Sequence, residues 1–394
     1  MPETGLCGLC ASHRNGGRVT ISPVDSQWCL TETSLPSEMA RERIDLFLLL
    51  HRFETWFREL VYVEMKVRFG EGWWIECEAA LKRNRGGGIP ADKALRGDRR
   101  HSHMATAEND PLWFISFDSL LKIVFDQKLW KLFLPFLTTK QLVRAKMLEL
   151  MPVRHRIAHA RALHREDLDR VRRILADLDQ GFWRFCTSYN DERPFIENHR
   201  KDPVFRHLVG RMFSGYSQLE SGEWTYLASR SGTTMDTSIS LIIRPSAGVV
   251  PFTRSSLAGK KGVLYSVTFS VAHTQARFQS DDILKATKSE HGKVAHVFLD
   301  SDELMLRVTL PSLLGEVELK RLIDRFHHVC LNSRTPVPRM GAAVDDAEPD
   351  QRKWYWMKMR PMRLLASEWP HYVVPPDNPL KFLGPDNPCN FLVS

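Results

Sequence analysis

The stretch Leu46–Val67, "LFLLLHRFETWFRELVYVEMKV", decides the first half of the fold. Its apolar side chains recur every three or four residues, as they do on one face of an α-helix. The residues of this stripe are Leu46, Leu49, Phe53, Trp56, Leu60, Val63 and Val67. Pro36 and Glu38 precede it as helix-start residues, and Gly70 and Gly72 follow it as helix-ending residues. The sequence therefore predicts one long amphipathic helix whose apolar stripe needs partners.

Segments further along the chain supply such partners. The apolar, aromatic segment 110–137 predicts one or two buried helices. Thr138 or Thr139 can cap a following helix, "KQLVRAKMLELM", which Pro152 breaks or kinks. A second stripe predicts another amphipathic helix through Leu168, Val171, Leu175, Leu178, Phe182 and Phe185. Residues 36–190 are thus predicted to form an all-α bundle of about four or five helices.

The hydrophobic pattern changes near residue 200. In "LYSVTFSVAH" (264–273), apolar and polar residues alternate with period two, and "LMLRVTLP" (304–311) does the same. The segments "TSISLIIR" and "KVAHVFLD" are further candidate strands, as is "KWYWMKM" (353–359). Such alternation predicts half-buried, mainly antiparallel strands, and one helix is predicted near residues 314–331. The fold class is therefore multidomain, with the helical bundle followed by an α+β domain over residues 200–394.

Composition limits the partners and the location of the protein. The 394 residues include 43% hydrophobic residues, and the net charge of +8 favours acidic partners, of which nucleic acid is the commonest. No run of about 18 apolar residues is present, which predicts no membrane span. The start, "MPETGLCGLC", lacks a signal-peptide layout, and the seven cysteines do not form a disulfide pattern. A cytoplasmic location is the prediction.

Residues 1–35 are predicted to be a cysteine-containing leader. Cys7, Cys10, His13 and Cys29 could together hold a zinc ion. A zinc ribbon needs two close cysteine pairs, however, and this segment has one. The interpretation we favour is a flexible leader without a metal.

Arginines are concentrated in two places that suggest nucleic-acid binding. Residues 83–110 hold three consecutive glycines and many arginines, which predicts a mobile basic loop. The predicted RNA-binding residues are Arg83, Arg85, Arg96, Arg99, Arg100, Arg156 and Arg161. The arginines of segment 165–185 are interpreted instead as a solvated face, because aspartates dilute their charge.

The segment Met151–His164, "MPVRHRIAHARALH", holds the candidate catalytic residues. Arg154 and His159 are five residues apart, about 140° around an ideal helix, but Pro152 just upstream could let them converge. Arginine binds phosphate oxygens with a planar fork, and histidine transfers protons near neutral pH. An RNA 2′-hydroxyl could then attack its own phosphate, with Arg154 stabilising the phosphorane, His159 acting as general base or acid and His155 assisting. The alternative is an ordinary solvated basic helix face.

The same segment resembles the signature of HEPN domains, in which an arginine is followed by Asn, Asp or His and, a few residues later, by a histidine. Arg154, His155 and His159 match it, although asparagine is commoner at the second position. "RFETWFRELVYVEMKVRFGEGWW" resembles the first long helix of bacterial HEPN proteins, and "DPLWFISFDSLLKIV" resembles their middle segment. The resemblance covers about residues 40–188.

This resemblance implies a helical bundle that often dimerises and pairs two Arg/His motifs in one cleft, which Glu54 and Arg58 could line. It implies a metal-independent endoribonuclease without a cofactor, acting on RNA as a toxin or antiphage-defence effector, with an antitoxin or trigger protein as a possible partner. Two alternatives stay open: an inactive module that binds nucleic acid or nucleotides, and a protein-interaction scaffold. Residues 200–394 match no family, and a sensing or substrate-selecting role is the expectation for them.

Overall fold

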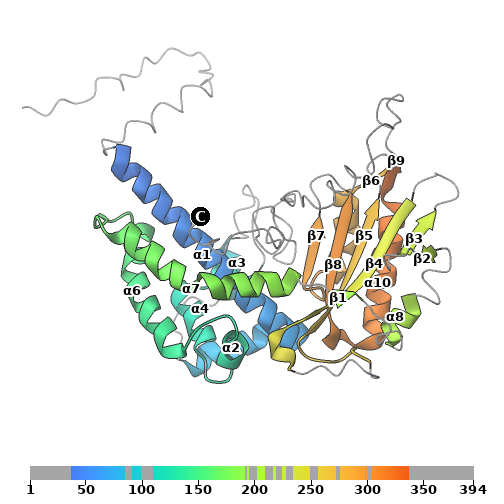
Figure 1. The fold of residues 1–394 in the computed structure, drawn as a ribbon, viewed down its shortest axis with the longest axis horizontal. Helices are drawn as coiled ribbons and strands as arrows, with labels where there is room; N and C mark the ends of the chain where they lie inside the picture. Colours follow the sequence, from blue (N-terminus) through green and yellow to red (C-terminus); the bar gives the residue numbers. More distant parts are fainter. Residues whose placement is uncertain are drawn as a thin grey trace, which may run out of the picture.

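The computed structural model describes residues 37–84, 91–98, 110–190, 193–194, 202–208, 216–218, 224–227, 234–248, 256–271, 276–299 and 304–336. Within them, a helical region is followed by an α+β region with an antiparallel sheet, as predicted. Figure 1 shows the helices of the first region on one side of the molecule and the sheet, with α8 and α10, on the other. The predicted leader and the candidate strand 353–359 lie outside the described residues.

Helix α1 (Ser37–Phe69) confirms the long amphipathic helix. All seven residues of its predicted stripe are buried. The short 3-10 helix η2 (Gly70–Gly72) ends α1, and Gly70 takes the left-handed conformation (φ 60°) that glycine adopts without strain. Helix α2 (Trp73–Arg83) follows directly and packs back against α1.

The aromatic segment 110–137 forms three short pieces around α1. These are η3 (Pro111–Phe114), α4 (Phe117–Val124) and α5 (Trp130–Phe133). The Ser116 hydroxyl caps α4 by accepting a hydrogen bond from the Ser119 N–H at 3.1 Å. The Phe117 ring lies 5.8 Å from the rings of both Phe53 and Phe57. The segment therefore supplies the aromatic packing that the stripe of α1 needs.

Helix α6 (Lys140–Ala158) continues through Pro152, so of the predicted break or kink the break is wrong. Thr139 caps its start, since its hydroxyl accepts a hydrogen bond from the Leu142 N–H. A proline leaves the carbonyl four residues earlier, here that of Leu148, without its helical partner. The Leu148 side chain is 68% exposed and Pro152 is also exposed. On this outer face water can bond the freed carbonyl, so the helix can continue.

Helix α7 (Asp167–Asn190) confirms the second predicted stripe and packs along α1. Gly181 lies on its inner side, against the backbone carbonyl of Phe136. A Cβ atom at this position would lie 1.8 Å from that carbonyl oxygen, far inside van der Waals contact. Only glycine therefore allows this close approach between α7 and the turn that follows α5.

The sheet has the strand order β2-β3-β4-β5-β8-β7, with β1 also paired to β4, and every pairing is antiparallel. Its strands are β1 (Arg193–Pro194), β2 (Tyr216–Gln218), β3 (Trp224–Leu227), β4 (Thr234–Ile243), β5 (Val263–Val271), β7 (His296–Leu299) and β8 (Met305–Pro311). The remaining elements are α8 (Pro203–His207), η6 (Pro245–Ala247), β6 (Ala276–Phe278), α9 (Ser280–Thr287), η7 (Lys288–Glu290), η8 (Ser312–Leu314), α10 (Gly315–Asn332) and β9 (Arg334–Pro336). Within the described residues, the predicted strands and the helix near 314–331 are thus present.

Both faces of the central strands are covered, so the prediction of half-buried strands is wrong there. Phe269 contacts His327 of α10, which lies along one face of the sheet (Figure 1). On the opposite face the Tyr189 hydroxyl of α7 is hydrogen-bonded to Thr309. Ser266 and Thr309 are therefore fully buried although they are polar. Local alternation could not reveal that the helical region covers the polar face.

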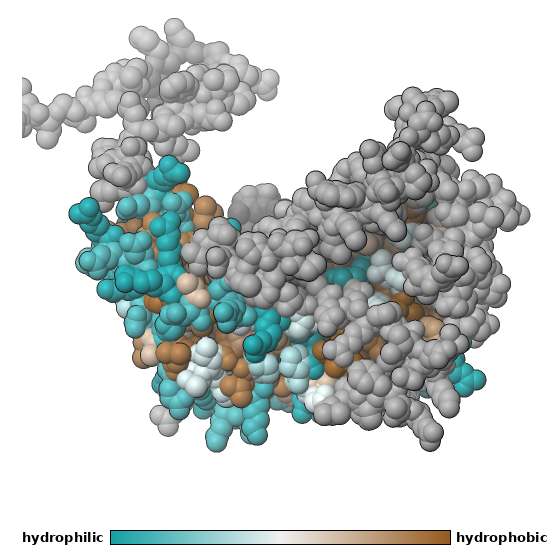
Figure 2. Space-filling model, in the orientation of Figure 1, coloured by the Kyte–Doolittle hydropathy of each residue, from teal (hydrophilic) through white to brown (hydrophobic). Residues whose placement is uncertain are grey.

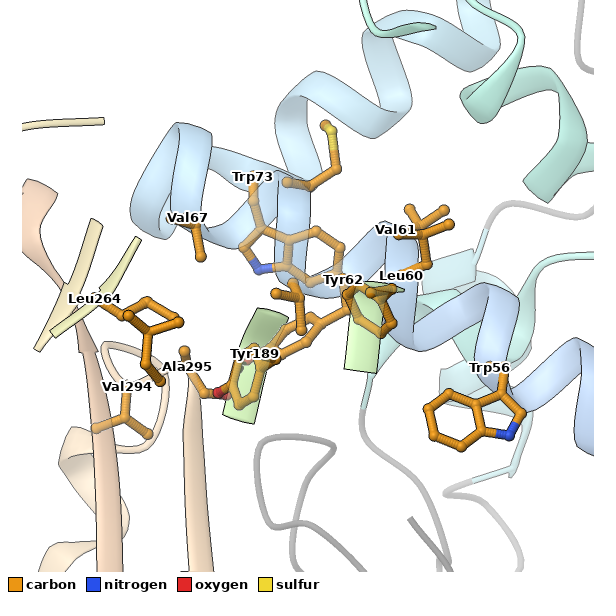
Figure 3. Close-up of a cluster of buried hydrophobic side chains, with 14 of the residues drawn as sticks. Trp56, Leu60, Val61, Tyr62, Val67, Trp73, Tyr189, Leu264, Val294 and Ala295 are labelled. Carbon is orange, nitrogen blue, oxygen red and sulfur yellow. Dashed lines mark hydrogen bonds between the residues drawn. The ribbon is translucent and has the colours of Figure 1, made fainter. Parts of the chain in front are cut away.

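The two regions share a buried interface. Arg244 donates from Nε to the Glu64 carboxylate at 2.7 Å, and both side chains are fully buried. The Arg244 guanidinium lies 5.3 Å from the rings of Phe136 and Phe185, which brings it into the helical region. Figure 3 shows the neighbouring cluster, in which Tyr62 of α1 lies near Tyr189 and Ala295. The Tyr62 hydroxyl donates a hydrogen bond to the Ala295 carbonyl at 2.7 Å.

Part of the predicted mobile loop 83–110 is helical. Helix α3 (Ala91–Asp98) occupies residues inside it, and α2 extends to Arg83 at its start. Figure 2 shows hydrophilic residues over much of the visible face of the helical region, with apolar residues between them. Over the described residues, no helix combines the length and apolar character that a membrane span requires.

Candidate functional site

The candidate motif occupies the last turn of α6 and the loop after it. His159 follows the final helical residue, and its N–H donates to the His155 carbonyl at 3.1 Å. Ala160 has a positive φ of 51°, which is uncommon for a residue with a side chain. The Arg161 N–H then donates to the Arg156 carbonyl at 2.8 Å. This tight turn ends α6 and directs the chain toward α7.

The Arg154 side chain is held against α1. Its Nε donates to the Glu54 carboxylate at 2.6 Å, and its guanidinium lies 5.9 Å from the Phe117 ring. Glu54 also faces the buried Arg58 at 3.6 Å, so one carboxylate serves two arginines. The Arg154 side chain remains 24% exposed. It is therefore fixed in place and still partly accessible to a phosphate.

His155 and His159 form an exposed pair on the outer face of α6. Their rings are stacked, with centroids 6.1 Å apart and an interplanar angle of 12°. Residues four apart share a helix face, and both side chains are exposed to solvent. Leu148 and Pro152 continue the same outer face toward the start of the helix. The imidazoles are thus available to a substrate or to a second protein surface.

Arg154 and His159 follow the geometry of an unbroken helix. Five residues correspond to a rotation of about 140°, so Arg154 faces α1 while His159 faces outward. Within the described residues, no hydrogen bond or ion pair joins Arg154 to either histidine. Within one chain, Arg154 is thus paired with Glu54 and His159 is exposed to solvent, and their convergence on one phosphate stays a prediction.

Two of the predicted RNA-binding arginines are engaged in ion pairs inside the chain. Arg83 donates two hydrogen bonds to Asp126, at 3.0 and 2.9 Å. Burial opposes ionisation of Asp126, but the hydrogen bonds from Arg83 and its neighbours outweigh it and lower the pKa of this carboxyl group. Arg156 donates from Nε to Asp167 at 2.9 Å. These two arginines stabilise the helical region, and their charge is already compensated.

The other predicted RNA-binding residues differ in position. Arg96 lies on α3 and is exposed. Arg161 is exposed in the loop after the motif, and its carbonyl accepts a hydrogen bond from Arg43 of α1 at 2.7 Å. Arg85, Arg99 and Arg100 lie outside the described residues. The structure thus places one exposed predicted arginine, Arg161, directly beside the motif.

A cavity of about 450 Å³ lies just after the motif, at the start of α7. His164, Arg165 and Arg170 line it together with Glu166 and Asp167. Over the described residues, neither Arg165 nor Arg170 forms an ion pair. The sequence interpretation had assigned these arginines to a solvated face. The sequence signal that could have identified Arg165 and Arg170 as cavity residues was their position directly after the Arg/His motif.

An exposed apolar patch lies on the first part of α1. Ile44, Phe47 and Leu48 are 58%, 54% and 53% exposed. Their spacing places them on the side of the helix opposite the buried stripe. The bond from Arg43 to the Arg161 carbonyl brings this part of α1 next to the loop that follows the motif. The patch therefore lies near the candidate site.

Neither a metal site nor a comparison with known proteins assigns a function to the described residues. Among the residues that the structure describes, no group of three or more His, Cys, Asp or Glu side chains could hold a metal ion. The predicted zinc candidates Cys7, Cys10, His13 and Cys29 lie outside that part of the chain. The chain matches no family model, no curated protein and no solved structure.

Proposed function

We propose that this chain is a metal-independent endoribonuclease of the HEPN type, acting in the cytoplasm as a toxin or antiphage-defence effector. The observation that carries the proposal is the arrangement around the end of α6. A partly exposed arginine is fixed by Glu54, and the next residue begins an exposed, stacked histidine pair. The resemblance of "MPVRHRIAHARAL" to the HEPN signature supports the same assignment.

The proposed reaction uses the RNA's own 2′-hydroxyl as nucleophile. The 2′-oxygen forms a bond to the adjacent phosphorus while the bond to the 5′-oxygen breaks. A proton leaves the 2′-hydroxyl and a proton joins the departing 5′-oxygen. His159 carries out one of these transfers as general base or acid, His155 assists with the other, and Arg154 stabilises the charged phosphorane. The products are a 2′,3′-cyclic phosphate and a 5′-hydroxyl end. This chemistry needs no cofactor, because nucleophile and leaving group both belong to the substrate.

We infer that the active form is a homodimer. In one chain Arg154 faces α1 and His159 faces outward, so a second copy is the simplest source of the missing partner group. The apolar residues Ile44, Phe47 and Leu48 offer a surface for such contact near the motif. In a symmetric dimer the same patch would be buried on both copies. The two Arg/His motifs would then share one cleft.

The test is cleavage of a tRNA mixture in the presence of EDTA. We expect the wild type to cut, and His159→Ala to cut at least about 100-fold more slowly, as is typical when a general acid or base is removed. His328→Ala is the matched control, because His328 is an exposed histidine on α10, far from the motif in the chain. Equal cleavage by wild type and His159→Ala would remove the assignment.

A second candidate function is binding of nucleic acid without cleavage. The cavity lined by His164, Arg165 and Arg170 favours it, because these side chains can contact phosphates whether or not the histidines act. This function predicts RNA binding that weakens steeply with salt, since bound phosphates release counterions. It predicts intact RNA after long incubation. An RNA affinity that does not change with ionic strength would contradict this function.

A further inference from the structure

A second cavity, of about 550 Å³, lies where the end of α1 meets the α+β region. Arg68 and the η2 turn form one side of it. Lys261, Lys293, Leu314 and Glu318 form the other side. Its size is in the range of small-molecule and cofactor sites, which run from about 300 to 1,000 Å³. The cavity belongs to neither the candidate motif nor the cavity at the start of α7.

The charges around this cavity favour an anion. Over the described residues, Arg68 and Lys261 make no ion pair and no side-chain hydrogen bond. Lys293 bonds Glu318 at 2.6 Å, but Arg321 bonds the same carboxylate at 2.7 Å. The charge of Glu318 is therefore shared between two cations. Glu71 is the remaining acidic residue in the wall, so the basic side chains outweigh the acidic ones.

The rest of the wall supplies apolar surface and open space. Phe69, Leu313 and Leu314 contribute apolar side chains, which suit a planar base. A Cβ atom at Gly72 would meet no heavy atom within 4 Å, so the cavity is open on that side. Helix α10 begins at Gly315, directly after Leu314, and the positive end of its dipole adds to the attraction of the basic side chains for an anion.

We propose that this cavity binds a nucleotide through its phosphate groups, with Arg68, Lys261 and Lys293 as the phosphate-binding residues. Arginine and lysine are the side chains that bind phosphate oxygens most strongly, and Arg68 and Lys261 have no ion-pair partner among the described residues. The proposal is independent of RNA cleavage at the motif. Because the walls come from both regions of the molecule, a bound nucleotide would hold α1 and the sheet together and raise the thermal stability of the protein.

Calorimetric titration of the full chain with ATP, sodium tripolyphosphate and adenosine tests this site. We expect ATP and tripolyphosphate to bind and adenosine to bind at least tenfold more weakly than ATP. In Arg68→Ala/Lys261→Ala, affinity for ATP should fall at least tenfold. The matched control is Arg277→Ala/Lys285→Ala, which removes two exposed basic side chains from β6 and α9 and should leave the affinity unchanged.

A second variant keeps every charge and fills the space. Gly72 has ordinary backbone angles (φ −78°, ψ 5°), so Gly72→Leu adds a side chain at the wall without backbone strain. We expect it to weaken ATP binding at least tenfold while the protein stays folded by circular dichroism. The proposal is overturned if the wild type binds neither phosphate probe at millimolar concentration. It is also overturned if the Arg68/Lys261 variant binds ATP as the wild type does, or if adenosine binds as tightly as ATP.

Discussion

At the scale of single residues, Arg154 shows how one side chain links the fold to the proposed chemistry. Its carboxylate partner, Glu54, is 100 residues away in the sequence and lies on another helix. The pair fixes the guanidinium on the inner side of α6, and the exposed part of the side chain is left for a phosphate. The structure thus shows that Glu54 holds the Arg154 side chain, whereas the sequence analysis named Glu54 only as a residue that could line the cleft.

Replacing Arg154 should abolish toxicity if the chain is a ribonuclease. Growth after induced expression in bacteria should be inhibited by the wild type and normal with Arg154→Ala, because the phosphorane loses its stabilising cation. Arg144→Ala is the control, since Arg144 is an exposed arginine on the same helix and has no ion pair within the described residues. Toxicity that persists at the same level in Arg154→Ala would point away from the proposed chemistry.

Gly181 is predicted to tolerate no side chain. Gly181→Ala would place a Cβ atom 1.8 Å from the Phe136 carbonyl oxygen, so α7 must move away from the turn that follows α5. We expect the free energy of unfolding to fall by about 3 kcal/mol, the upper end of the usual cost of overpacking. Urea denaturation measures this fall. Gly292→Ala is the control, because a Cβ atom there meets nothing within 4 Å, and an unchanged midpoint for Gly181→Ala would show that the contact is not tight.

At the scale of elements, α1 is shared by the two regions of the molecule. Its first half carries the exposed apolar patch and Glu54 follows near its middle. Its second half carries Tyr62, Glu64 and Lys66, which contact the α+β region. Lys66 donates to the Gly292 carbonyl, and burial lowers the pKa of its ammonium group to about 8. Because α1 is buried in both regions, a change that destabilises α1 should destabilise both of them.

The buried Glu64–Arg244 pair should show strong coupling. Glu64→Leu leaves the Arg244 charge buried without its partner, which should cost about 3 to 5 kcal/mol of unfolding free energy. The double variant Glu64→Leu/Arg244→Met should recover most of that loss, because no charge is then left buried. Urea denaturation of both single variants and the double variant gives the coupling energy. Additive losses would mean that the two side chains do not depend on each other.

At the scale of the whole molecule, buried titratable groups make stability depend on pH. Burial lowers the pKa of His291 and of His327 to about 4, and that of His296 well below its usual value. As pH falls below about 6.5, the unfolded chain therefore binds protons that the folded chain does not, and stability decreases. Burial raises the pKa of Asp110 to about 7. Between pH 7 and the pKa of this carboxyl group in the unfolded chain, the folded chain binds the extra proton, so Asp110 increases stability as the pH falls.

The histidines should dominate this balance between pH 6.5 and 4.5. Three histidines act against Asp110 and against Glu64, whose pKa burial also raises. Each net proton that the unfolded chain binds lowers the free energy of unfolding by about 1.4 kcal/mol per pH unit. The urea concentration at the unfolding midpoint should therefore be lower at pH 5 than at pH 7. His327→Gln should reduce the fall, and the exposed control His328→Gln should not. A midpoint that rises on acidification would contradict the sign of this balance.

The assembly should depend on the apolar patch of α1. Phe47→Glu places a charge where the proposed dimer buries an apolar ring, so we expect the protein to become monomeric in sedimentation analysis. Val317→Glu is the control, because Val317 is an apolar residue on α10 that is 82% exposed. If the dimer is required for catalysis, RNA cleavage should fall together with dimerisation. A wild-type protein that is monomeric at all concentrations would remove the dimer from the proposal.

The sequence by itself determined which segments form helices and strands, because period and polarity are local properties of the chain. The stripe of α1, the stripe of α7 and the alternation in β5 all identify the apolar face of an element correctly. The motif residues were also visible, since they are adjacent in the chain.

Only the tertiary structure decided what each face contacts. In the folded chain α6 continues past Pro152, and the polar side of β5 is buried. Arg154 pairs with Glu54 and Arg244 pairs with Glu64, although these partners are 100 and 180 residues apart in the sequence. The physical reason is that these contacts depend on how distant elements pack, and a local pattern shows that a face is apolar or polar without showing what will cover it.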